Sequence, residues 1–268
     1  MRVTVITPSK DQGSYIEDCL CSVHGQTHHD VEHIVLDALS KDATAAVAAQ
    51  YPCTFLQKKD TGPAQAINHG LDMATGDIIC WLNADDMFWS KTTLEEIVRT
   101  FTEHPEVDVI TGNGYFVSED GKLLQPISGL PERFSLCWMK MGDFILQPAT
   151  FWRRNQFRLD ENLHYCFDWK LWIEMLQAGL NLLYVPSYFA RYRVHTTSLT
   201  YQDSASRRRE IYGMARQYDG RRTQMGWCWL VWRIYQLAEW VGSRKLKRLA
   251  CVANEAMKRL SGGRIQSC

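Results

Sequence analysis

The first half of the chain alternates short β-type runs with stretches of helical periodicity. Apolar and β-branched residues cluster at residues 2–7, 32–37, 53–57 and 77–82. Between these runs, apolar side chains recur at helical spacing at residues 14–26, 42–50 and 63–74. The fourth run is apolar on both faces, which is typical of a central strand covered by helices on both sides. The alternation predicts an α/β fold with a mainly parallel sheet sandwiched by helices.

The pattern becomes less regular after residue 125 and basic after residue 203. The elements expected beyond residue 90 are a helix at 92–101, a strand at 107–117, a helix at 167–178 and two β-runs at 181–185 and 188–194. Thr92 and Glu95 offer a capping box to the first of these helices, and Asp120-Gly121 predicts a hairpin turn. We expect one domain over residues 1–200 and a helical C-terminal extension over residues 201–268.

The charges are divided unevenly along the chain. Its 268 residues include 30 Lys or Arg and 30 Asp or Glu, so the net charge is zero. Residues 207–268 nevertheless hold 14 basic and 4 acidic residues, a net charge of +10, which leaves −10 for residues 1–206. This asymmetry indicates that the two parts face different partners, and an anionic surface is one candidate for the basic part.

The cysteines and the apolar stretches favour a cytoplasmic location. The nine cysteines form no CxxC pair and no regular framework, as expected of thiols in a reducing compartment. The first residues are too poor in apolar side chains for a signal peptide. The charge-free stretches that are richest in apolar residues, such as residues 223–232, run to ten residues, whereas a membrane-spanning helix needs about 20. We expect a protein that is cytoplasmic or peripheral on the cytoplasmic membrane face.

Acidic residues follow several of the predicted strands. Asp37 ends the second strand, Asp60 follows the third, and Asp85 and Asp86 follow the fourth. In open parallel α/β sheets, ligands bind beyond the carboxyl ends of the strands. Adjacent carboxylates repel each other unless a cation neutralises them, and Mg²⁺ or Mn²⁺ takes carboxylate and phosphate oxygens as ligands. The pair therefore predicts a metal–diphosphate site, and the alternative is that Asp86 caps the following helix.

Two other kinds of ligand site lack their usual spacing. No GxGxxG follows the first strand and no GxxxxGK[ST] occurs, which argues against a dinucleotide dehydrogenase and a P-loop NTPase. Four histidines cluster at His24, His28, His29 and His33, but without the spacing of a zinc finger. We interpret these histidines as solvated surface side chains.

An ordered set of motifs spans most of the chain. It comprises Val5-Ile-Thr-Pro-Ser-Lys-Asp-Gln-Gly-Ser-Tyr-Ile, Ile34-Val-Leu-Asp37, Asp60-Thr-Gly62 with Gln65-Ala-Ile-Asn68, Ala74-Thr-Gly-Asp-Ile-Ile-Cys-Trp-Leu-Asn-Ala-Asp-Asp86, Gln147-Pro-Ala-Thr-Phe151, Phe167-Asp168-Trp-Lys-Leu-Trp172 and Tyr192-Arg-Val-His195. In this order the motifs resemble family 2 glycosyltransferases, which have the GT-A fold, over about residues 1–200. Lys10 and Ala38-Leu39 depart from the usual family pattern.

The resemblance implies a binding site for a nucleotide-sugar donor, with a UDP-sugar favoured. Thr7 and Pro8 match the segment that touches the nucleoside, Asp37 matches the acid that contacts the base, and Asp60 matches an acid of the nucleotide pocket. Gln65 and Gln147 fall in motifs placed around the donor, although a simple turn also explains Gln147-Pro148.

The resemblance also implies a metal-assisted, inverting transfer with a carboxylate base. Asn83, Asp85 and Asp86 match the DXD-like motif, so Mn²⁺ or Mg²⁺ is expected on Asp85 and Asp86, with Asn83 and Asp85 contacting the donor. His195 matches a histidine that helps to bind the metal, and an ordinary loop histidine is the alternative. Asp168 matches the general base, which takes the proton of the acceptor hydroxyl. The alternative for Asp168 is a first-turn acid of its helix.

Residues 225–250 combine five Trp and Tyr side chains with five Lys and Arg side chains. This composition suits an interfacial helix on anionic lipid. Packing on the acidic body and a dimer contact are the alternatives, and no nucleic-acid-binding motif occurs.

The sequence as a whole thus predicts a glycosyltransferase that uses a glycan or lipid-linked acceptor. A sugar nucleotidyltransferase and a non-catalytic carbohydrate- or nucleotide-binding protein of the same fold are the rival hypotheses.

Overall fold

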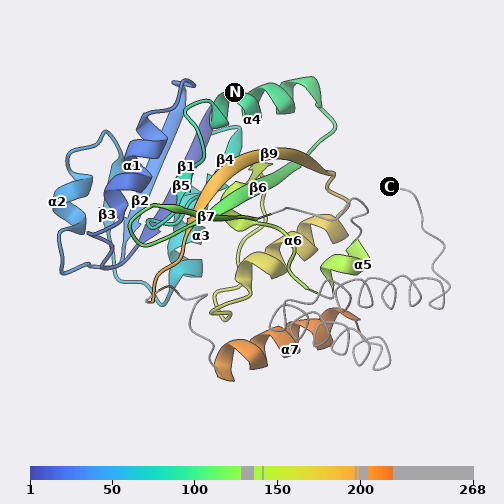
Figure 1. Cartoon of the computed structure of the whole chain (residues 1–268). Helices are drawn as coiled ribbons and strands as arrows, with labels where there is room; N and C mark the ends of the chain where they lie inside the picture. Colours follow the sequence, from blue (N-terminus) through green and yellow to red (C-terminus); the bar gives the residue numbers. More distant parts are fainter. Residues whose placement is uncertain (128–135, 141, 197, 199–204, 220–268) are drawn as a thin grey trace. The chain divides into compact units, whose positions relative to one another are not determined.

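The structure is a computed structural model that describes residues 1–127, 136–140, 142–196, 198 and 205–219 (Figure 1). The chain divides into two compact units, Met1–Tyr212 and Gly213–Cys268. The sheet, the helices that cover it and every sequence-predicted site residue belong to the first unit. The aromatic and basic stretch 225–250, for which membrane contact is predicted, lies outside the described residues.

A single mixed sheet forms the centre of the first unit (Figure 1). Its strands are β1 (Val3–Ser9), β2 (Val31–Asp37), β3 (Thr54–Gln57), β4 (Ile78–Trp81), β5 (Met87–Phe88), β6 (Val109–Val117), β7 (Leu123–Ile127), β8 (Thr150–Arg153) and β9 (Leu182–Arg193). Their order is β3-β2-β1-β4-β8-β6-β9-β5, with β7 paired to β6. Strands β3, β2, β1 and β4 are parallel to one another, as are β6 and β9, whereas β8 runs antiparallel between β4 and β6.

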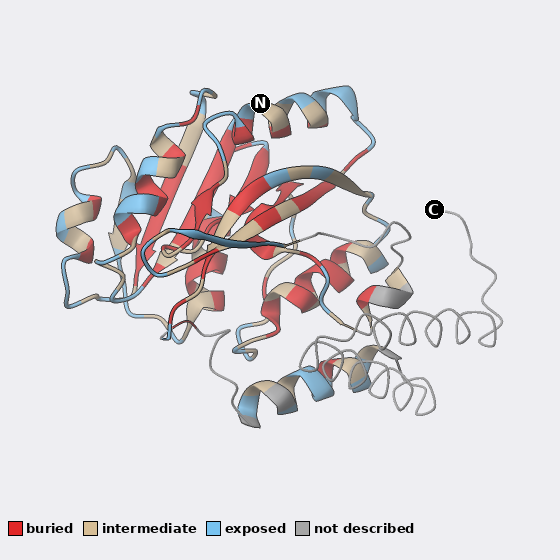
Figure 2. Ribbon diagram, in the orientation of Figure 1, coloured by how far each residue is buried: buried red, intermediate tan, exposed pale blue. Residues whose placement is uncertain are grey.

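Helices cover both faces of this sheet. The described helices are α1 (Ile16–His24), α2 (Thr44–Ala48), α3 (Pro63–Met73), α4 (Thr93–Glu103), α5 (Leu136–Met139), α6 (Phe167–Gln177) and α7 (Ala205–Asp219), with a short 3-10 turn, η1, at Gln147–Ala149. One face packs the apolar residues of α1 and α4 against alternate residues of the strands, such as Val5 and Cys80. The other face receives α3 and α6. The ribbon segments of the buried residues are red in Figure 2.

Close packing explains a glycine of α3. A Cβ at Gly70 would lie 2.6 Å from Ile6 Cγ2 and 2.9 Å from Leu36 Cδ1. Only a residue without a side chain lets α3 approach β1 and β2 this closely. On α6, Trp172 packs edge to face on Trp152 of β8, and Phe167 stacks on Trp81 of β4.

The expected α/β architecture is confirmed, and the strand pattern differs in two places. The first four β-runs form β1–β4, and the Asp-Gly turn joins β6 to β7. Strand β8 lies in the region whose sequence pattern is irregular. It was not predicted, because its four residues are too few to show a periodicity. The two β-runs expected at 181–185 and 188–194 form the single strand β9, whose pairing with β6 shifts register near Asn113 and Tyr188.

Two local expectations were wrong. The Thr92 side chain makes no capping hydrogen bond to α4, and the Glu95 carboxylate instead accepts a hydrogen bond from Thr27 Oγ1 (2.6 Å). His33 is not a surface residue: it is 3% exposed and its Nε2 lies 3.0 Å from Thr7 Oγ1. Burial lowers the pKa of the His33 imidazole to about 3, with a further contribution from His24.

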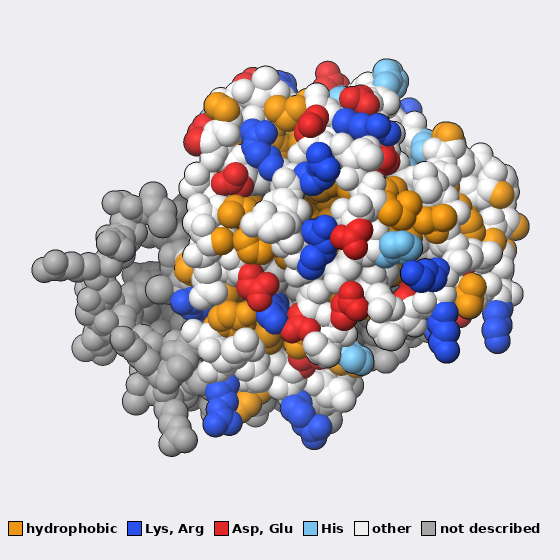
Figure 3. Space-filling view, turned by 180° about the vertical axis from the view of Figure 1, so that it is seen from behind, with side chains coloured by type: hydrophobic (Ala, Val, Ile, Leu, Met, Phe, Trp, Pro, Cys, Tyr) orange, Lys and Arg blue, Asp and Glu red, His pale blue; other side chains and the backbone are white. Residues whose placement is uncertain are grey.

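Two surface properties complete the description of the fold. Acidic and basic side chains are interspersed on the face seen from behind (Figure 3), so the acids of this unit do not gather into one large patch there. Among the described helices, none has the length and apolar character that a bilayer crossing requires.

Candidate active site

The carboxyl ends of the first strands lie side by side. Ser9 of β1 is in register with Asp37 of β2, which is in register with Gln57 of β3. A depression of about 410 Å³ opens beside these ends and is lined by Lys10, Asp11, Ala38, Leu39, Lys41, Lys59 and Asp60. A smaller cavity of about 40 Å³ adjoins it through Asp60, and Asp37 and Gln65 also line it. The fold therefore brings together three of the predicted donor-binding residues.

Asp37 is buried and organises the turn beside this depression. Its Oδ2 accepts hydrogen bonds from the Ser40 backbone N–H (2.9 Å) and from Gln57 Nε2 (3.0 Å), and its Oδ1 accepts one from Ser40 Oγ. Leu39, within this turn, is 51% exposed and has φ of 58°, in the left-handed region. Most side chains avoid this conformation, so the Asp37–Ser40 contacts hold a strained turn at the edge of the cavity.

Asp60 is the acid that lines both cavities. Burial raises the pKa of its carboxyl group, and the charge of Asp37 adds to this effect. The Gly62 N–H and the Lys10 ammonium act in the opposite direction. Gln65 is engaged nearby, since its Oε1 accepts from the Thr61 N–H (3.0 Å) and its Nε2 donates to Glu161 (3.1 Å).

Asp85 and His195 meet beyond the carboxyl end of β4. His195 Nε2 lies 2.8 Å from Asp85 Oδ2, although the two residues are 110 positions apart. The His195 side chain is 1% exposed and the Asp85 side chain 16% exposed. The Tyr15 ring packs on the imidazole with 4.7 Å between the ring centroids. Two of the three predicted metal ligands are therefore adjacent, and one of them faces solvent.

Asp86 points away from this pair, into the protein. It is 1% exposed, and its carboxylate accepts hydrogen bonds from the Arg193 backbone N–H (3.0 Å) and from Asn83 Nδ2 (3.2 Å). Burial raises the pKa of Asp86 well above its ordinary value, and the neighbouring charge of Asp85 raises it further. Within the described part of the chain, no group of three or more His, Cys, Asp or Glu side chains is arranged to hold a metal ion.

Asn83 and Gln147 tie the end of β4 to the turn η1. Asn83 Nδ2 also donates to Gln147 Oε1 (3.2 Å), and Asn83 Oδ1 accepts from Trp81 Nε1 (2.6 Å). Gln147 Nε2 donates to the Trp81 carbonyl oxygen (2.5 Å), and the Gln147 residue is 7% exposed. Both side chains thus shape the segment that carries Asp85.

Arg193 joins several elements around this segment. It is 2% exposed, its Nε donates to the Asp85 carbonyl oxygen (3.0 Å), and its Nη2 donates to Asp18 of α1 (2.5 Å). Its Nη1 donates to the carbonyl oxygen of Glu119 in the β6–β7 turn. The guanidinium also lies over the Tyr15 ring, at 5.2 Å. One buried side chain therefore fixes the backbone next to both Asp85 and His195.

Thr7 and Pro8 lie on β1, behind the depression. Thr7 is fully buried, and its hydroxyl contacts His33 Nε2 and Cys19 Sγ (3.8 Å). Pro8 is half-buried. Beyond them, Ser9 Oγ and Gln12 Oε1 are buried atoms with no hydrogen-bond partner among the described residues. A ligand at the end of β1 would supply such partners.

Asp168 lies in the first turn of α6. Its Oδ1 accepts a hydrogen bond from the Trp169 N–H (2.7 Å), so it does contribute to the start of the helix as the alternative hypothesis expected. Burial raises the pKa of its carboxyl group to about 6, and the charge of Glu210 acts in the same direction. The Trp169 N–H and the Arg207 guanidinium lower the pKa. Asp168 is therefore half-buried, ionised at neutral pH and more basic than an ordinary aspartate.

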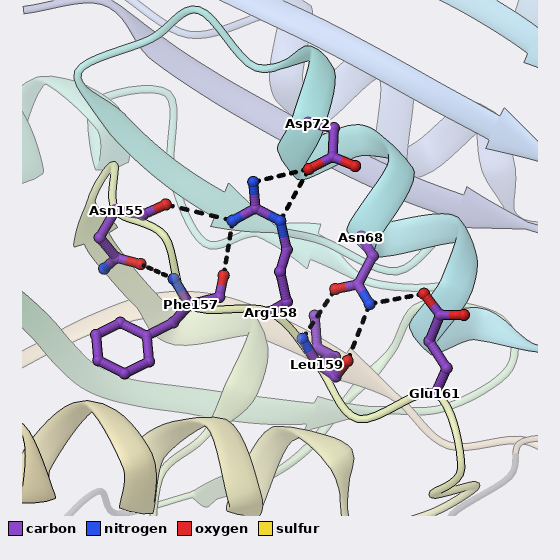
Figure 4. A network of polar contacts seen from close by, with 7 residues as sticks. All are labelled: Asn68, Asp72, Asn155, Phe157, Arg158, Leu159 and Glu161. Carbon is purple, nitrogen blue, oxygen red and sulfur yellow. Dashed lines mark hydrogen bonds and ion pairs between the residues drawn. The ribbon is translucent and has the colours of Figure 1, made fainter.

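The loop that leads to Asp168 is bound to α3 (Figure 4). Asn68 pairs with the backbone of Leu159 through hydrogen bonds of 2.8 and 2.9 Å and donates to Glu161 (2.9 Å). Arg158 donates from Nε and Nη2 to Asp72 Oδ1 (2.9 and 2.7 Å). The α3 helix, whose first turns line the smaller cavity, thus positions the segment that precedes the predicted base.

The comparison with protein families decides the chain's membership. The model of glycosyl transferase family 2 matches residues 4–172, which contain β1–β4 and the start of α6 up to Trp172. The chain belongs to glycosyl transferase family 2. The family resemblance of its motifs is thereby confirmed.

Curated relatives of the chain are named as glycosyltransferases. An uncharacterized glycosyltransferase of Rickettsia typhi is 26% identical over 214 residues, which cover 74% of this chain and 65% of the relative. A second relative is TuaG of Bacillus subtilis, which is named as a teichuronic acid biosynthesis glycosyltransferase. It is 28% identical over 207 residues, which cover 74% of this chain and 81% of TuaG. The chain thus spans just under two thirds of the Rickettsia relative.

Two solved glycosyltransferases have the same fold as this chain. Residues 1–349 of TarS from S. aureus, in complex with UDP-GlcNAc, align with a TM-score of 0.65 at 18% identity, over 85% of this chain and 70% of TarS. The mannosyltransferase PcManGT of Pyrobaculum calidifontis, in complex with GDP-Man and Mn²⁺, aligns with a TM-score of 0.57 at 19% identity, over 74% of this chain and 58% of PcManGT. The GT-A fold is thereby confirmed.

Some residues of the candidate site were missed by sequence reasoning. Arg193, Tyr15 and Glu210 were not predicted to take part, because their partners are 44 or more residues away. Arg193 lies inside the Tyr192-Arg-Val-His195 motif and Tyr15 inside the motif that begins at Val5, so the motifs offered a signal for these two residues but none for Glu210.

Proposed function

We propose that the chain transfers a sugar from a nucleoside diphosphate donor to an acceptor hydroxyl in glycan or polysaccharide synthesis, with inversion at the anomeric carbon. The observation that carries this proposal is the pairing of Asp85 and His195 beyond the carboxyl end of β4. Strand β4 is the parallel neighbour of β1, and two cavities lie at the ends of β1–β3. A UDP-sugar is the favoured donor, in line with the UDP-GlcNAc bound to TarS.

The donor nucleoside is proposed to occupy the depression at the ends of β1–β3. Asp37 and Asp60 offer carboxylates toward a base and a ribose, and Lys10 adds a positive charge near Asp60. Ser9 Oγ, buried without a partner in the described part of the chain, supports a polar ligand at this end of β1.

Asp85 and His195 have the chemistry to hold a divalent metal together with a diphosphate. A carboxylate oxygen and an imidazole nitrogen suit Mn²⁺, and Mg²⁺ also accepts the carboxylate. Asp86, committed to Arg193 and Asn83, fits a supporting role better than the role of a ligand. When bound, such a metal neutralises charge on the diphosphate leaving group as a Lewis acid.

Asp168 is proposed as the general base. The acceptor oxygen attacks the anomeric carbon as the bond between that carbon and the diphosphate oxygen breaks. The electron pair of the broken bond leaves with the nucleoside diphosphate, and the proton of the hydroxyl passes to Asp168. A carboxyl group with a pKa of about 6 is ionised at pH 7 and still basic enough to take this proton.

The test measures nucleotide release from a panel of UDP- and GDP-sugars with Mn²⁺, using water as the acceptor. We expect Asp85→Asn to weaken the dependence on Mn²⁺ and Asp168→Asn to lower turnover by about 10²–10⁴-fold. Asp30→Asn, at a side chain 63% exposed, is the matched control and should retain wild-type turnover. Full turnover in both site variants would refute the assignment. Retention of the anomeric configuration, seen by NMR of the product, would refute inversion.

The basic stretch 225–250 is proposed to bind anionic membrane at the cytoplasmic face, where lipid-linked acceptors are available. Each Lys or Arg near such a surface contributes about 1 kcal/mol. Co-sedimentation with vesicles of phosphatidylglycerol and phosphatidylcholine would compare the full chain with a full-length variant in which Arg244, Lys245, Lys247 and Arg248 are alanine. Equal sedimentation of the two proteins would contradict membrane binding.

A further inference from the structure

The first part of α7 reaches the start of α6. The Glu210 carboxylate accepts hydrogen bonds from three consecutive backbone N–H groups, those of His164 (2.9 Å), Tyr165 (2.6 Å) and Cys166 (2.6 Å). Cys166 is the residue that precedes α6, and Asp168 stands two positions after it. The residues that Glu210 joins are 44 to 46 positions away in the sequence.

Glu210 supplies the hydrogen-bond acceptors at the start of α6 that the local sequence lacks. The residue at the N-cap position of α6, Cys166, makes no side-chain capping hydrogen bond. Backbone N–H groups ahead of a helix need acceptors, and a negative charge is favoured at this end by the helix dipole. Glu210 meets both needs from a distant part of the chain. Residue 210 also lies beyond the segment 4–172 that matches the family.

The same turn of α7 acts electrostatically on Asp168. Glu210 raises and Arg207 lowers the pKa of the Asp168 carboxyl group. The other ionisable groups that interact with Asp168 are Asp143, ahead of η1, and Cys166. The pKa of Asp168 therefore responds to a positive and a negative side chain of α7 in opposite directions.

We propose that Glu210 is a positioning residue for Asp168, and that the start of α7 is consequently a working part of the transferase site. This inference rests on the proposed role of Asp168 as the base. By holding the backbone of residues 164–166, Glu210 fixes the entry into α6 and hence the place of the Asp168 carboxylate relative to the acceptor hydroxyl. A displacement of about 1 Å at such a group costs about 10²-fold in rate.

Three variants of the full chain test this proposal, with nucleotide release from the best UDP- or GDP-sugar of the panel and Mn²⁺ as the assay. Glu210→Ala should lower kcat by about ten- to a hundredfold with little change in the KM for the donor, because the donor cavity is formed by other elements. Glu210→Gln keeps an oxygen acceptor and removes the charge, so the acid limb of the kcat profile should move to lower pH. Arg207→Gln should move the same limb to higher pH.

Glu103→Gln is the matched control, since Glu103 is an exposed carboxylate at the end of α4, which lies well apart from α6 in Figure 1. It should leave both kcat and the acid limb unchanged. A purely structural Glu210 would change the thermal unfolding midpoint without the opposite pH shifts of the Gln variants.

The outcomes separate this inference from the proposed function. If Asp168→Asn is inactive while folded Glu210→Ala keeps wild-type kcat, the positioning role is overturned and the base assignment stands. If Asp168→Asn keeps its turnover, the base assignment itself is overturned. Should Glu210→Ala fail to fold, the Gln variants decide: an acid limb that does not move in either of them overturns the proposal.

Discussion

Replacing the predicted base should make the protein more stable while it removes the activity. In Asp168→Asn the side chain keeps its size and an oxygen that can accept the Trp169 N–H, but it loses the charge. Burial raises the pKa of the native carboxyl group from 3.8 to about 6. The folded state therefore holds this carboxylate at a cost in free energy, and the variant does not carry that cost.

The magnitude follows from the two pKa values. A raised carboxyl pKa destabilises the folded state above the unfolded value of 3.8, and the penalty is complete above pH 6. The penalty is about 0.6 kcal/mol at pH 4 and about 3 kcal/mol at pH 7.5. The substitution Asp168→Asn should thus raise the free energy of unfolding by about 2 kcal/mol more at pH 7.5 than at pH 4. Each kcal/mol raises the Tm of a chain of this size by about 2–4 °C.

Thermal unfolding followed by circular dichroism at both pH values measures this difference. Asp30→Asn, which changes an exposed carboxylate, should show no gain that depends on pH. A stability gain of Asp168→Asn that is the same at both pH values, or a loss at pH 7.5, would show that the Asp168 carboxylate is not destabilised by burial. The argument for its raised basicity would then fail with it.

Other substitutions test the packing and hydrogen bonds around the site. Arg193→Ala should lower the free energy of unfolding by about 2–4 kcal/mol and weaken Mn²⁺ binding, because the buried Asp85 carbonyl oxygen loses its donor; unfolding and Mn²⁺ titration measure both. Gly70→Ala should cost about 1–3 kcal/mol, since its Cβ would meet Ile6 at 2.6 Å, and a Tm equal to wild type would contradict the packing. In an NMR titration, the His33 imidazole should stay neutral until about pH 3. In the unfolded chain the same imidazole takes up a proton below pH 6.5, so the free energy of unfolding should fall as the pH is lowered from 6.5.

The positions of the main elements followed from local patterns. Strands β1–β4 and helices α1, α3 and α6 lie where apolar periodicity predicted them, because each buries an apolar face against the sheet. Strand β8 was missed, since its pairing with β4 and β6 comes from the rest of the sheet and leaves little local signal in four residues. The capping box predicted for Glu95 was wrong because its hydrogen-bond partner, Thr27, is distant in the sequence and leaves no local signal.

Within the site, the sequence by itself determined which residue types stand at the carboxyl ends of the strands. Asp37, Asp60 and Asp85 were identifiable because parallel strands bring their ends to one edge of a sheet, whatever the details of packing. The ordered motifs also indicated the family that the comparison confirmed.

Only the tertiary structure decided how these residues divide their tasks. Asp85 and Asp86 are neighbours in the sequence, yet one faces His195 at the surface and the other is buried against the Arg193 backbone. Buried hydrogen bonds of this kind join segments more than a hundred residues apart, and no local pattern specifies them. Glu210 likewise acts on Asp168 because its carboxylate reaches the backbone just before α6, a contact between segments 44 residues apart.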